Sequence, residues 1–537
     1  MKIIKNKYLN QLFLIPFFVI LLFPLLIFAV KEGSFSLFLS YIISIIIPFV
    51  IINIIKINPF NLIWISFPFF FIAVIYTVVV FEYQTDVNVN TWEVLLNSNK
   101  EEASEFFNEI KAITFLFLII QFFTYITYFI FFIKVRKTIF KRTKRTSNIA
   151  FIIAFFLLVD FGVKGATKKA FPISFSEGLI EYIYAKYKEK KYLNVKEKIK
   201  LKTKRSIFFK EDIKETIIVV IGESLRRDNL EYYGYNKATT PNLKKENLIC
   251  YTDVVSPANQ SVNSIKRVFS LAELDDENGY LKYPTFIKAF KEVGFKTHWI
   301  STQSIFGIHD SEISYIAKET DNVYFMNNNF DEILFEPYEQ LLDEKANKKM
   351  IFIHLMGSHA SYSKRTPKMF KHFSKNKSKS KNKKENKINL YDDTVRYNDY
   401  ILSFFLNKLK EQEGEKTFLM FSDHGESLYD SGDNLCFHGS TKPSKSEYNI
   451  PFILWFSDEF KKNHSSLYNQ VILNKNKAII LSDFFHSMPS LYGLEFLKKD
   501  KSKNFFSKEY ISSNNRKVLN GRKKLLNYND LPNKIIE

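Results

Sequence analysis

Ile217–Leu243 reads IIVVIGESLRRDNLEYYGYNKATTPNL, and the fold of the whole chain is interpreted outward from this stretch. Its first five residues are apolar and mostly β-branched, and they stop at Gly222 and Glu223. This pattern predicts a buried strand that opens at its carboxyl end into a polar loop. Phe418–Phe421 has the same form and runs into SDHGE. Ligands of open α/β sheets bind at such strand ends, so two buried strands that each deliver a carboxylate to one sheet edge indicate a metal site.

Strand-like and helical segments alternate along the chain after Thr216. The strand-like runs are Ile217–Ile221, Thr297–Ser301, Met350–His354, Thr417–Phe421 and Pro451–Trp455, and the helical ones include Thr285–Glu292 and Tyr397–Lys410. This alternation predicts an α/β domain with a mostly parallel sheet over residues 216–537. Within it, Lys371–Lys387 (KHFSKNKSKSKNKKENK) is basic and of low complexity, which predicts a mobile, solvated loop.

The composition of the chain is that of a membrane domain joined to a soluble one. The sequence has 537 residues, and its Phe (56 in all) and Ile concentrate in the first 165 residues. Lys plus Arg exceeds Asp plus Glu by 76 − 56 = 20, but no motif for binding DNA or RNA accompanies this excess. Membrane topology and anionic lipid surfaces account for it better, so we expect no nucleic-acid partner. Cys250 and Cys436 are too few for a disulfide framework or a cysteine-based zinc site, and a single bridge between them stays open.

Five apolar runs precede the α/β domain, and each is near the ~20 residues that cross a bilayer as a helix. They are Leu12–Val30, Phe35–Ile55, Phe60–Phe81, Ile113–Val135 and Asn148–Val163. The loop between the fourth and fifth runs, KVRKTIFKRTKRTS, carries seven Lys or Arg and no acid, whereas the loop between the third and fourth is acidic. The positive-inside rule therefore predicts a five-span α-helical membrane domain over residues 1–165, after which the chain faces outward. Residues 166–215 are amphipathic and Lys-rich, which predicts either bridging helices along the membrane surface or a plain solvated linker.

Four clusters outside the membrane domain contain the residue types that metal-assisted chemistry needs. They are Glu223 in GES, Ser261 in SPANQSVNSIKRVFS, His354 and His359 in HLMGSH, and Asp423, His424 and His438 in SDHGESLYDSGDNLCFHG. Carboxylates and imidazoles are ligands that suit zinc, and a nearby metal ion lowers the pKa of a serine hydroxyl and makes it a nucleophile. A single His or Asp is more often structural. Four of the nine histidines, however, lie beside strand ends or glycine-rich turns, and this grouping favours a catalytic site.

These clusters resemble those of the membrane-bound phosphoethanolamine transferases of Gram-negative bacteria, whose catalytic domain is of the alkaline-phosphatase/sulfatase type. GESLRRDNLEYYGYNKATTP is similar to the opening motif of that family, and SVNSIKRVFS aligns with its nucleophile segment and places Ser261 where the family has Thr. GSH ending at His359 and DHGESL…HG ending at His438 resemble the later motifs. The acidic outer loop and the five-span layout are similar too, so the resemblance covers nearly the whole chain.

The resemblance implies zinc-dependent transfer of phosphoethanolamine from phosphatidylethanolamine to an acceptor in the cell envelope: lipid A, the lipopolysaccharide core or another surface glycan. Ser261 would form a covalent phospho-enzyme in a ping-pong reaction. The implied roles are zinc binding by Glu223, Ser261, Asp423 and His424, contact with the phosphoryl group or a second zinc by His359 and His438, and substrate contact by His354. The implied location is the bacterial inner membrane, with the catalytic domain in the periplasm.

Two departures from the family pattern and three alternatives accompany this interpretation. Serine replaces the usual threonine nucleophile, with Ser264 as a less favoured substitute. With only two cysteines, the chain resembles the cysteine-poor members of the family, which modify core sugars.

A phosphoglycerol transferase of the lipoteichoic-acid-synthase type has a similar architecture but a different opening motif. A sulfatase would need Pro and Arg shortly after its modified residue, and Ser261–Ile265 (SVNSI) lacks both. A non-catalytic membrane scaffold with a decayed enzyme domain is disfavoured, because every ligand type is retained.

Overall fold

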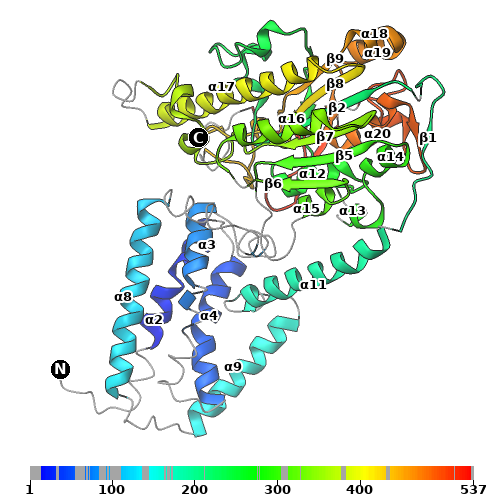
Figure 1. The fold of residues 1–537 in the computed structure, drawn as a ribbon. Helices are drawn as coiled ribbons and strands as arrows, with labels where there is room; N and C mark the ends of the chain where they lie inside the picture. The colour runs from blue at the N-terminus through cyan, green and yellow to red at the C-terminus, as the bar shows by residue number, and fades with distance from the viewer. Residues whose placement is uncertain are drawn as a thin grey trace. The chain divides into compact units, whose positions relative to one another are not determined.

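The structure is a computed structural model, and it describes residues 14–31, 35–54, 67, 70–71, 73–83, 92, 96, 110–135, 144–162, 165, 170, 173–196, 198–210, 212–274, 276, 278–303, 312–326, 328–375, 383–430, 436–512 and 515–533. The chain divides into two compact units, residues 1–188 and 189–537 (Figure 1). The division falls inside the segment expected to link the two domains. The three-part division with boundaries near residues 165 and 215 stays a prediction.

The first unit is helical, and its helices coincide with four of the five predicted spans. Its elements are α2 (Leu14–Leu21), α3 (Phe23–Lys31), α4 (Phe35–Ile54), the π-helical η1 (Val79–Tyr83), α8 (Ala112–Val135), α9 (Lys144–Gly162) and the start of α11 (Ile173–Lys196). The third predicted span, Phe60–Phe81, is described only at residues 67, 70–71 and 73–81. Among the described residues, one helical segment, Ala112–Ile130, is long and apolar enough to cross a membrane, and Phe35–Ile47 and Asn148–Asp160 are shorter apolar helices. The number of spans therefore stays a prediction.

The second unit is built on a seven-stranded sheet in the order β3-β9-β8-β2-β7-β5-β6. Its strands are β2 (Glu215–Gly222), β3 (Ile249–Cys250), β5 (Lys296–Ser301), β6 (Asn322–Phe325), β7 (Lys348–His354), β8 (Glu415–Ser422) and β9 (Phe452–Phe456). The five strands from β8 to β6 are parallel, whereas β9 pairs antiparallel with both β8 and β3. The prediction of a mostly parallel sheet is confirmed, and all five predicted strands are present.

Helices cover both faces of this sheet (Figure 1). Ile217, Val219 and Ile221 of β2 face a core that includes α12 (Ser261–Phe269), α14 (Ile287–Glu292), α15 (Glu312–Ala317) and α20 (Phe484–Ser487). Ile218 and Val220 face a second core, with α16 (Phe335–Asp343) and α17 (Lys383–Lys410). A strand buried on both faces must be apolar at every position, which explains the unbroken run IIVVI. The remaining helices are α13 (Gly279–Lys282), α18 (Asp458–Asn463) and α19 (Ser465–Leu473).

The predicted loop Lys371–Lys387 is partly helical. Helix α17 begins at Lys383, so the last five residues of that segment belong to it, while residues 376–382 lie outside the described part of the chain. The prediction failed here because Lys and Glu form helices well, and a polar composition does not separate an exposed helical turn from a loop. The ammonium groups of Lys384 and Lys387 lie 5.0 and 4.9 Å from the ring centres of Tyr429 and Tyr362.

Short strand pairs complete the second unit. They are β1 (Lys204–Arg205) with β11 (Leu494–Glu495), β4 (Val254–Val255) with β10 (Ile479–Ile480), and the hairpin of β12 (Lys517–Leu519) with β13 (Leu525–Asn527). The hairpin holds the loop before α12, since the Leu519 N–H donates to the carbonyl of Pro257 at 2.9 Å. Its turn also contacts the loop after His438, where the Gly521 N–H donates to the carbonyl of Ser440 at 3.1 Å.

The two cysteines are both free. Cys250 lies in β3, and the sulfur of Cys436 lies 3.6 Å from the hydroxyl of Tyr362. The bridge that the sequence left open is therefore not formed in this structure.

Candidate active site

Glu223 follows β2 directly and is buried at the carboxyl edge of the sheet. The next residue, Ser224, has a φ of +54°, a conformation uncommon for any residue other than glycine. Its hydroxyl donates to Glu223 Oε1 at 2.7 Å, and its N–H donates to Asp423 Oδ1 at 3.1 Å. The strained turn is thus held by the two carboxylates that the sequence placed at neighbouring strand ends.

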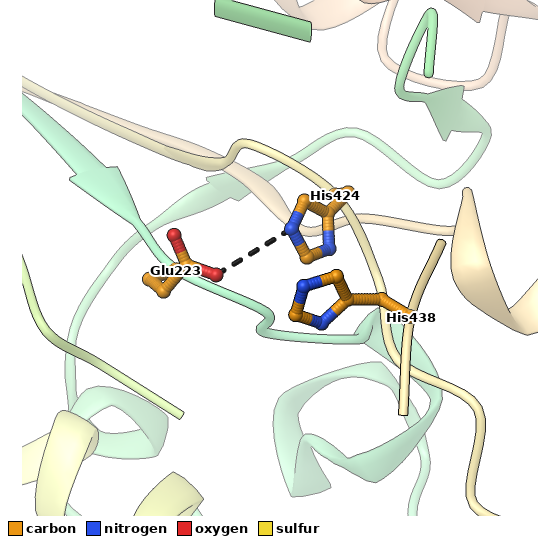
Figure 2. Close-up of side chains that lie close together, drawn as sticks. All are labelled: Glu223, His424 and His438. Carbon is orange, nitrogen blue, oxygen red and sulfur yellow. Dashed lines mark ion pairs between the residues drawn. The ribbon is translucent and has the colours of Figure 1, made fainter. Parts of the chain in front are cut away.

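Asp423 and His424 follow β8, the strand next to β2. The Asp423 N–H donates to the carbonyl of Gly222 at 2.9 Å, which continues the parallel register of the two strands. His424 Nδ1 lies 2.7 Å from the carbonyl of Gly425, and since a carbonyl only accepts, this nitrogen carries a proton. The other ring nitrogen, Nε2, lies 3.4 Å from Glu223 Oε1 (Figure 2). It also lies 3.4 Å from Asp423 Oδ2.

Ser261 is the first residue of α12, and its hydroxyl lies at the same place. Its Oγ is 3.1 Å from Glu223 Oε2 and 3.2 Å from His424 Nε2. The partial positive charge at a helix N-terminus favours negative charge on a group in this position. The hydroxyl of Ser264, by contrast, donates to the backbone carbonyl of Asp423 at 2.6 Å. The geometry therefore favours Ser261 over Ser264 as the nucleophile.

His438 and His359 border this group. The imidazole of His438 lies beside that of His424, with 4.2 Å between ring centres, and one of its nitrogens faces Glu223 (Figure 2). The ring centre of His359 is 6.1 Å from that of His438. Gly357 brings His359 close, since its φ is +55° and a Cβ there would lie 2.9 Å from the carbonyl oxygen of Glu223.

His354 lies further from this group at the end of β7. Its Nδ1 is 3.3 Å from the Ser301 hydroxyl, and its ring packs against that of Trp299 with 5.9 Å between centres. Its buried Nε2 has no hydrogen-bond partner among the described residues. The structure therefore brings six of the seven predicted site residues together. The seventh, His354, is buried behind them, against Ser301 and Trp299.

Charge is unevenly balanced at this site. Burial, and then the neighbouring Glu223 carboxylate, raise the pKa of Asp423 to about 7. Burial lowers the pKa of His424, but Asp423 and Glu223 outweigh it and raise that pKa to about 10. Burial also opposes ionisation of Glu223, yet the hydrogen bond and charge of His424 hold its pKa well below the ordinary range. Without another cation, one protonated imidazole has to balance both carboxylates.

The side chains at this site fit a divalent cation. Among the described residues, Glu223, His424 and His438 each offer a ligand atom within 4.8 Å of the others. Asp423 Oδ2 is buried and has no hydrogen-bond partner there, so an oxygen ligand is already desolvated. Carboxylate, imidazole and hydroxyl groups together form a donor set that suits zinc. A metal ion in this position would supply the positive charge that the two carboxylates lack.

Sequence reasoning missed three residues that support the site. Glu426 accepts from His438 Nδ1 at 3.0 Å and from the hydroxyl of Tyr362 at 2.9 Å, and Gln303 donates to Glu223 Oε2 at 3.3 Å. A signal for Glu426 was present, because SDHGE holds a second carboxylate three residues after Asp423. No sequence pattern marked Tyr362 or Gln303, because their positions at the site depend on how α17 and β5 pack.

Comparison with known proteins supports the same interpretation. A sequence model of the sulfatase family matches residues 215–494, more than half of the chain. Phosphoethanolamine transferase EptC of Escherichia coli is 26% identical over 336 residues, which cover 59% of this chain and 58% of that protein. The chain thus matches about three fifths of the length of that curated relative. The resemblance to phosphoethanolamine transferases is confirmed.

Two solved structures have a similar fold. The C-terminal periplasmic domain of E. coli EptC, crystallised in complex with Zn, is 26% identical, has a TM-score of 0.57 and covers 62% of this chain and 96% of that one. The integral membrane protein lipooligosaccharide phosphoethanolamine transferase A from Neisseria meningitidis has a TM-score of 0.61 at 17% identity and covers 81% of this chain and 84% of that one. The second likeness concerns the fold alone, and it reaches beyond the unit of residues 189–537.

Proposed function

This chain belongs to the sulfatase family, and on that premise we propose that it transfers phosphoethanolamine from phosphatidylethanolamine to an acceptor in the bacterial cell envelope. The observation that carries the proposal is the hydroxyl of Ser261 between Glu223 and His424 at the N-terminus of α12. Relatives named phosphoethanolamine transferase support the transferred group.

In the first half-reaction Ser261 is the nucleophile. Its Oγ forms a bond to the phosphorus of the donor, the bond from phosphorus to the diacylglycerol oxygen breaks, and diacylglycerol leaves with a proton. The Ser261 hydroxyl donates to Glu223 Oε2 at 3.1 Å, so this carboxylate can accept the proton that the serine loses, and the proton can pass on to the oxygen of the leaving diacylglycerol. The product is a phosphoethanolamine ester on Ser261.

In the second half-reaction an acceptor hydroxyl or phosphate attacks the same phosphorus. The bond from phosphorus to Ser261 Oγ breaks, the acceptor hydroxyl loses its proton, and Glu223 can return a proton to the Ser261 oxygen. Both steps are in-line displacements at one phosphorus, so one set of side chains serves both. His359 and His438 border the site and would contact the phosphoryl oxygens or a second metal ion. His354 is buried behind them at the end of β7, so the substrate contact expected of it stays a prediction.

Zinc completes the proposed site. Glu223, Ser261, Asp423 and His424 would hold one ion, and the zinc complex of the EptC domain supports the choice of metal. When bound, the ion would lower the pKa of the Ser261 hydroxyl and offset the charge on the phosphoryl oxygens. The burial of Asp423 and Glu223 excludes water from the groups that would hold it.

The proposed setting is the inner membrane, with the catalytic unit in the periplasm. Apolar side chains such as Phe115 and Phe123 of α8 are largely exposed on the first unit, which favours a lipid-facing surface. The donor is a membrane lipid, so an embedded enzyme meets it without extracting it into water. The acceptor would be lipid A, a core sugar or another surface glycan.

Peptide mass spectrometry tests this function directly. The full-length protein in detergent is incubated with phosphatidylethanolamine, digested, and fragmented to locate the modified residue. We expect a phosphoethanolamine adduct on Ser261, and its complete loss together with at least a ~10³-fold lower transfer rate in Ser261→Ala. An unchanged thermal midpoint of that variant would show that the fold is intact.

Other outcomes of the same experiment would contradict the proposal. An adduct that persists in Ser261→Ala would move the nucleophile to a neighbour such as Ser264. A phosphoglycerol adduct formed from phosphatidylglycerol instead would favour the lipoteichoic-acid-synthase type of reaction. Full transfer activity in Ser261→Ala would contradict the covalent mechanism.

A further inference from the structure

Glu426 is a fully buried carboxylate beside the site, outside the proposed set of zinc ligands and nucleophile. Its Oε2 lies 3.0 Å from His438 Nδ1. An ionised carboxylate only accepts hydrogen bonds, so this contact places a proton on Nδ1. The hydroxyl of Ser224, 3.4 Å from the same nitrogen, already donates to Glu223, so it too is an acceptor there.

The consequence falls on the other nitrogen of the ring. A neutral imidazole carries one N–H, so with the proton on Nδ1 the nitrogen Nε2 presents an electron pair. Figure 2 shows the His438 ring turned toward Glu223 and His424, with one nitrogen facing them. In the opposite tautomer the ring would present an N–H to this position instead. The partner of Nδ1 therefore decides which chemistry His438 can perform.

Glu426 is itself fixed at its second oxygen. The buried hydroxyl of Tyr362 donates to Oε1 at 2.9 Å, and the ring of Tyr362 packs against Tyr391 with 5.1 Å between centres. Tyr391 donates to the carbonyl of Ser224 at 2.7 Å and accepts from the N–H of Arg226 at 2.9 Å. The carboxylate thus belongs to a connected set of contacts that reaches the loop carrying Glu223.

We propose that Glu426 is a positioning residue, held by Tyr362, that fixes the orientation and the Nδ1–H tautomer of His438 so that its Nε2 presents an electron pair to the phosphoryl site. This proposal rests on the proposed function for its catalytic meaning, because the electron pair would accept the proton of the acceptor hydroxyl or bind a cation there. Partners of this kind orient imidazoles in many metal sites, and their loss costs about 10- to 100-fold in activity.

The chain contains a matched control. Glu415 is a second buried carboxylate paired with a histidine, and its Oε2 lies 3.0 Å from Nε2 of His464. This pair lies at the amino end of β8, at the opposite edge of the sheet from Asp423. Glu415→Ala removes a buried carboxylate–histidine contact just as Glu426→Ala does, without touching the site.

The kinetic test compares these variants in the full-length, zinc-loaded protein with phosphatidylethanolamine as donor. We expect Glu426→Ala to lower kcat by about 10- to 100-fold with little change in the KM for the donor. Glu426→Gln, whose amide oxygen still accepts from Nδ1, should recover most of this loss, and Tyr362→Phe should cost about fivefold, the effect of one hydrogen bond. Glu415→Ala should keep the wild-type kcat per folded molecule.

Two results would overturn the proposal: a wild-type kcat in Glu426→Ala, or a Glu426→Gln variant as impaired as Glu426→Ala. If Glu426→Ala fails to fold, Glu426→Gln and Tyr362→Phe still decide, because equal large losses in both would contradict an acceptor role.

A spectroscopic readout separates this proposal from the proposed function. In protein labelled with ¹⁵N-histidine at alkaline pH, solid-state spectra distinguish protonated from unprotonated ring nitrogens, and His438→Gln identifies the signal of His438. We expect Nδ1 protonated and Nε2 unprotonated, with that pattern lost in Glu426→Ala. The opposite tautomer would refute the positioning role even in an active enzyme. A wild-type protein that shows the expected tautomer but transfers no phosphoethanolamine would refute only the proposed function.

Discussion

Strands β2 and β8 each have an acidic residue at or next to both ends. The buried carboxylates at the two ends differ in the groups that pair with them. At the amino end Glu215 and Glu415 are register partners, and both are buried. Cationic or polar side chains from outside the sheet meet them: Arg205 donates to Glu215 at 2.5 Å, and Asn463 and His464 lie 2.7 and 3.0 Å from Glu415.

At the carboxyl end one imidazole serves both carboxylates. His424 Nε2 lies 3.4 Å from Glu223 and 3.4 Å from Asp423. A third buried carboxylate, Glu426, lies two residues after His424. Burying ionised groups is costly unless they are paired, so the carboxyl end is short of positive charge and the amino end is not. This difference favours the carboxyl end, where the protein supplies fewer cations of its own, as the place where a metal ion would bind.

The largest difference between the two strand ends is expected in the zinc content of variants. We expect Asp423→Asn and Glu223→Gln to weaken zinc binding by at least ~100-fold, since each removes a charged oxygen ligand. Glu415→Gln, the equivalent change at the other end of β8, should leave zinc binding unchanged. Elemental analysis of the purified full-length protein measures this directly. Equal zinc loss in Glu415→Gln and Asp423→Asn would show that the two ends do not differ as described.

Removing the cation at the amino end should cost stability, not activity. Arg205→Ala leaves Glu215 buried and unpaired, which we expect to lower the free energy of unfolding by ~3 kcal/mol at pH 7. Burial already raises the pKa of Glu215 above 4.5, and Arg205 counteracts that rise, so the variant carboxyl will have a still higher pKa.

The pH dependence of that variant follows from this shift. A folded state with the higher pKa binds more protons than the unfolded state, so the stability of Arg205→Ala falls as pH rises through the folded pKa of Glu215. The deficit relative to wild type should therefore be largest near pH 7 and shrink toward pH 4.5. Thermal unfolding at both pH values measures it. A deficit that grows on acidification would contradict the arrangement.

The smallest effect is expected at His464. Replacement by Gln removes one hydrogen bond to Glu415 but leaves Asn463 in place, so we expect a loss of about 1 kcal/mol in stability. The stacking of His464 on Phe209, with 4.2 Å between ring centres, contributes to the same loss. Zinc content and kcat should not change. A fall in zinc content would mean that the two ends of the sheet are coupled.

Much of the catalytic unit could be predicted because its strands are buried on both faces. The apolar runs around Ile217 and Phe418 fit strands covered on both faces, and the acids that follow them meet at one edge because β2 and β8 are neighbours. The parallel register of β2 and β8, with Gly222 opposite Ser422, then brings Glu223, Asp423 and His424 close together.

The other features of the site depend on tertiary packing, which no local sequence pattern encodes. Ser261 reaches the site because the C-terminal hairpin holds the preceding loop, and Glu426 matters because Tyr362 lies opposite it. The start of α17 at Lys383 was missed because Lys-rich segments look alike as loops and as exposed helices. The number of membrane spans stays a prediction, since apolar length alone marks it.

The C-terminal hairpin also sets an order in time. A chain exported as it is synthesised delivers β2 first, then Ser261, then β8 with Asp423 and His424, and the hairpin last. Leu519 is the backbone partner of Pro257 and Asn259 in the loop that leads to Ser261. The serine is therefore secured only after nearly all of the described chain has emerged. Until the hairpin has formed, the loop that leads to Ser261 lacks its backbone hydrogen bonds to Leu519, so the proposed site is completed by the end of the described chain rather than by its first strands.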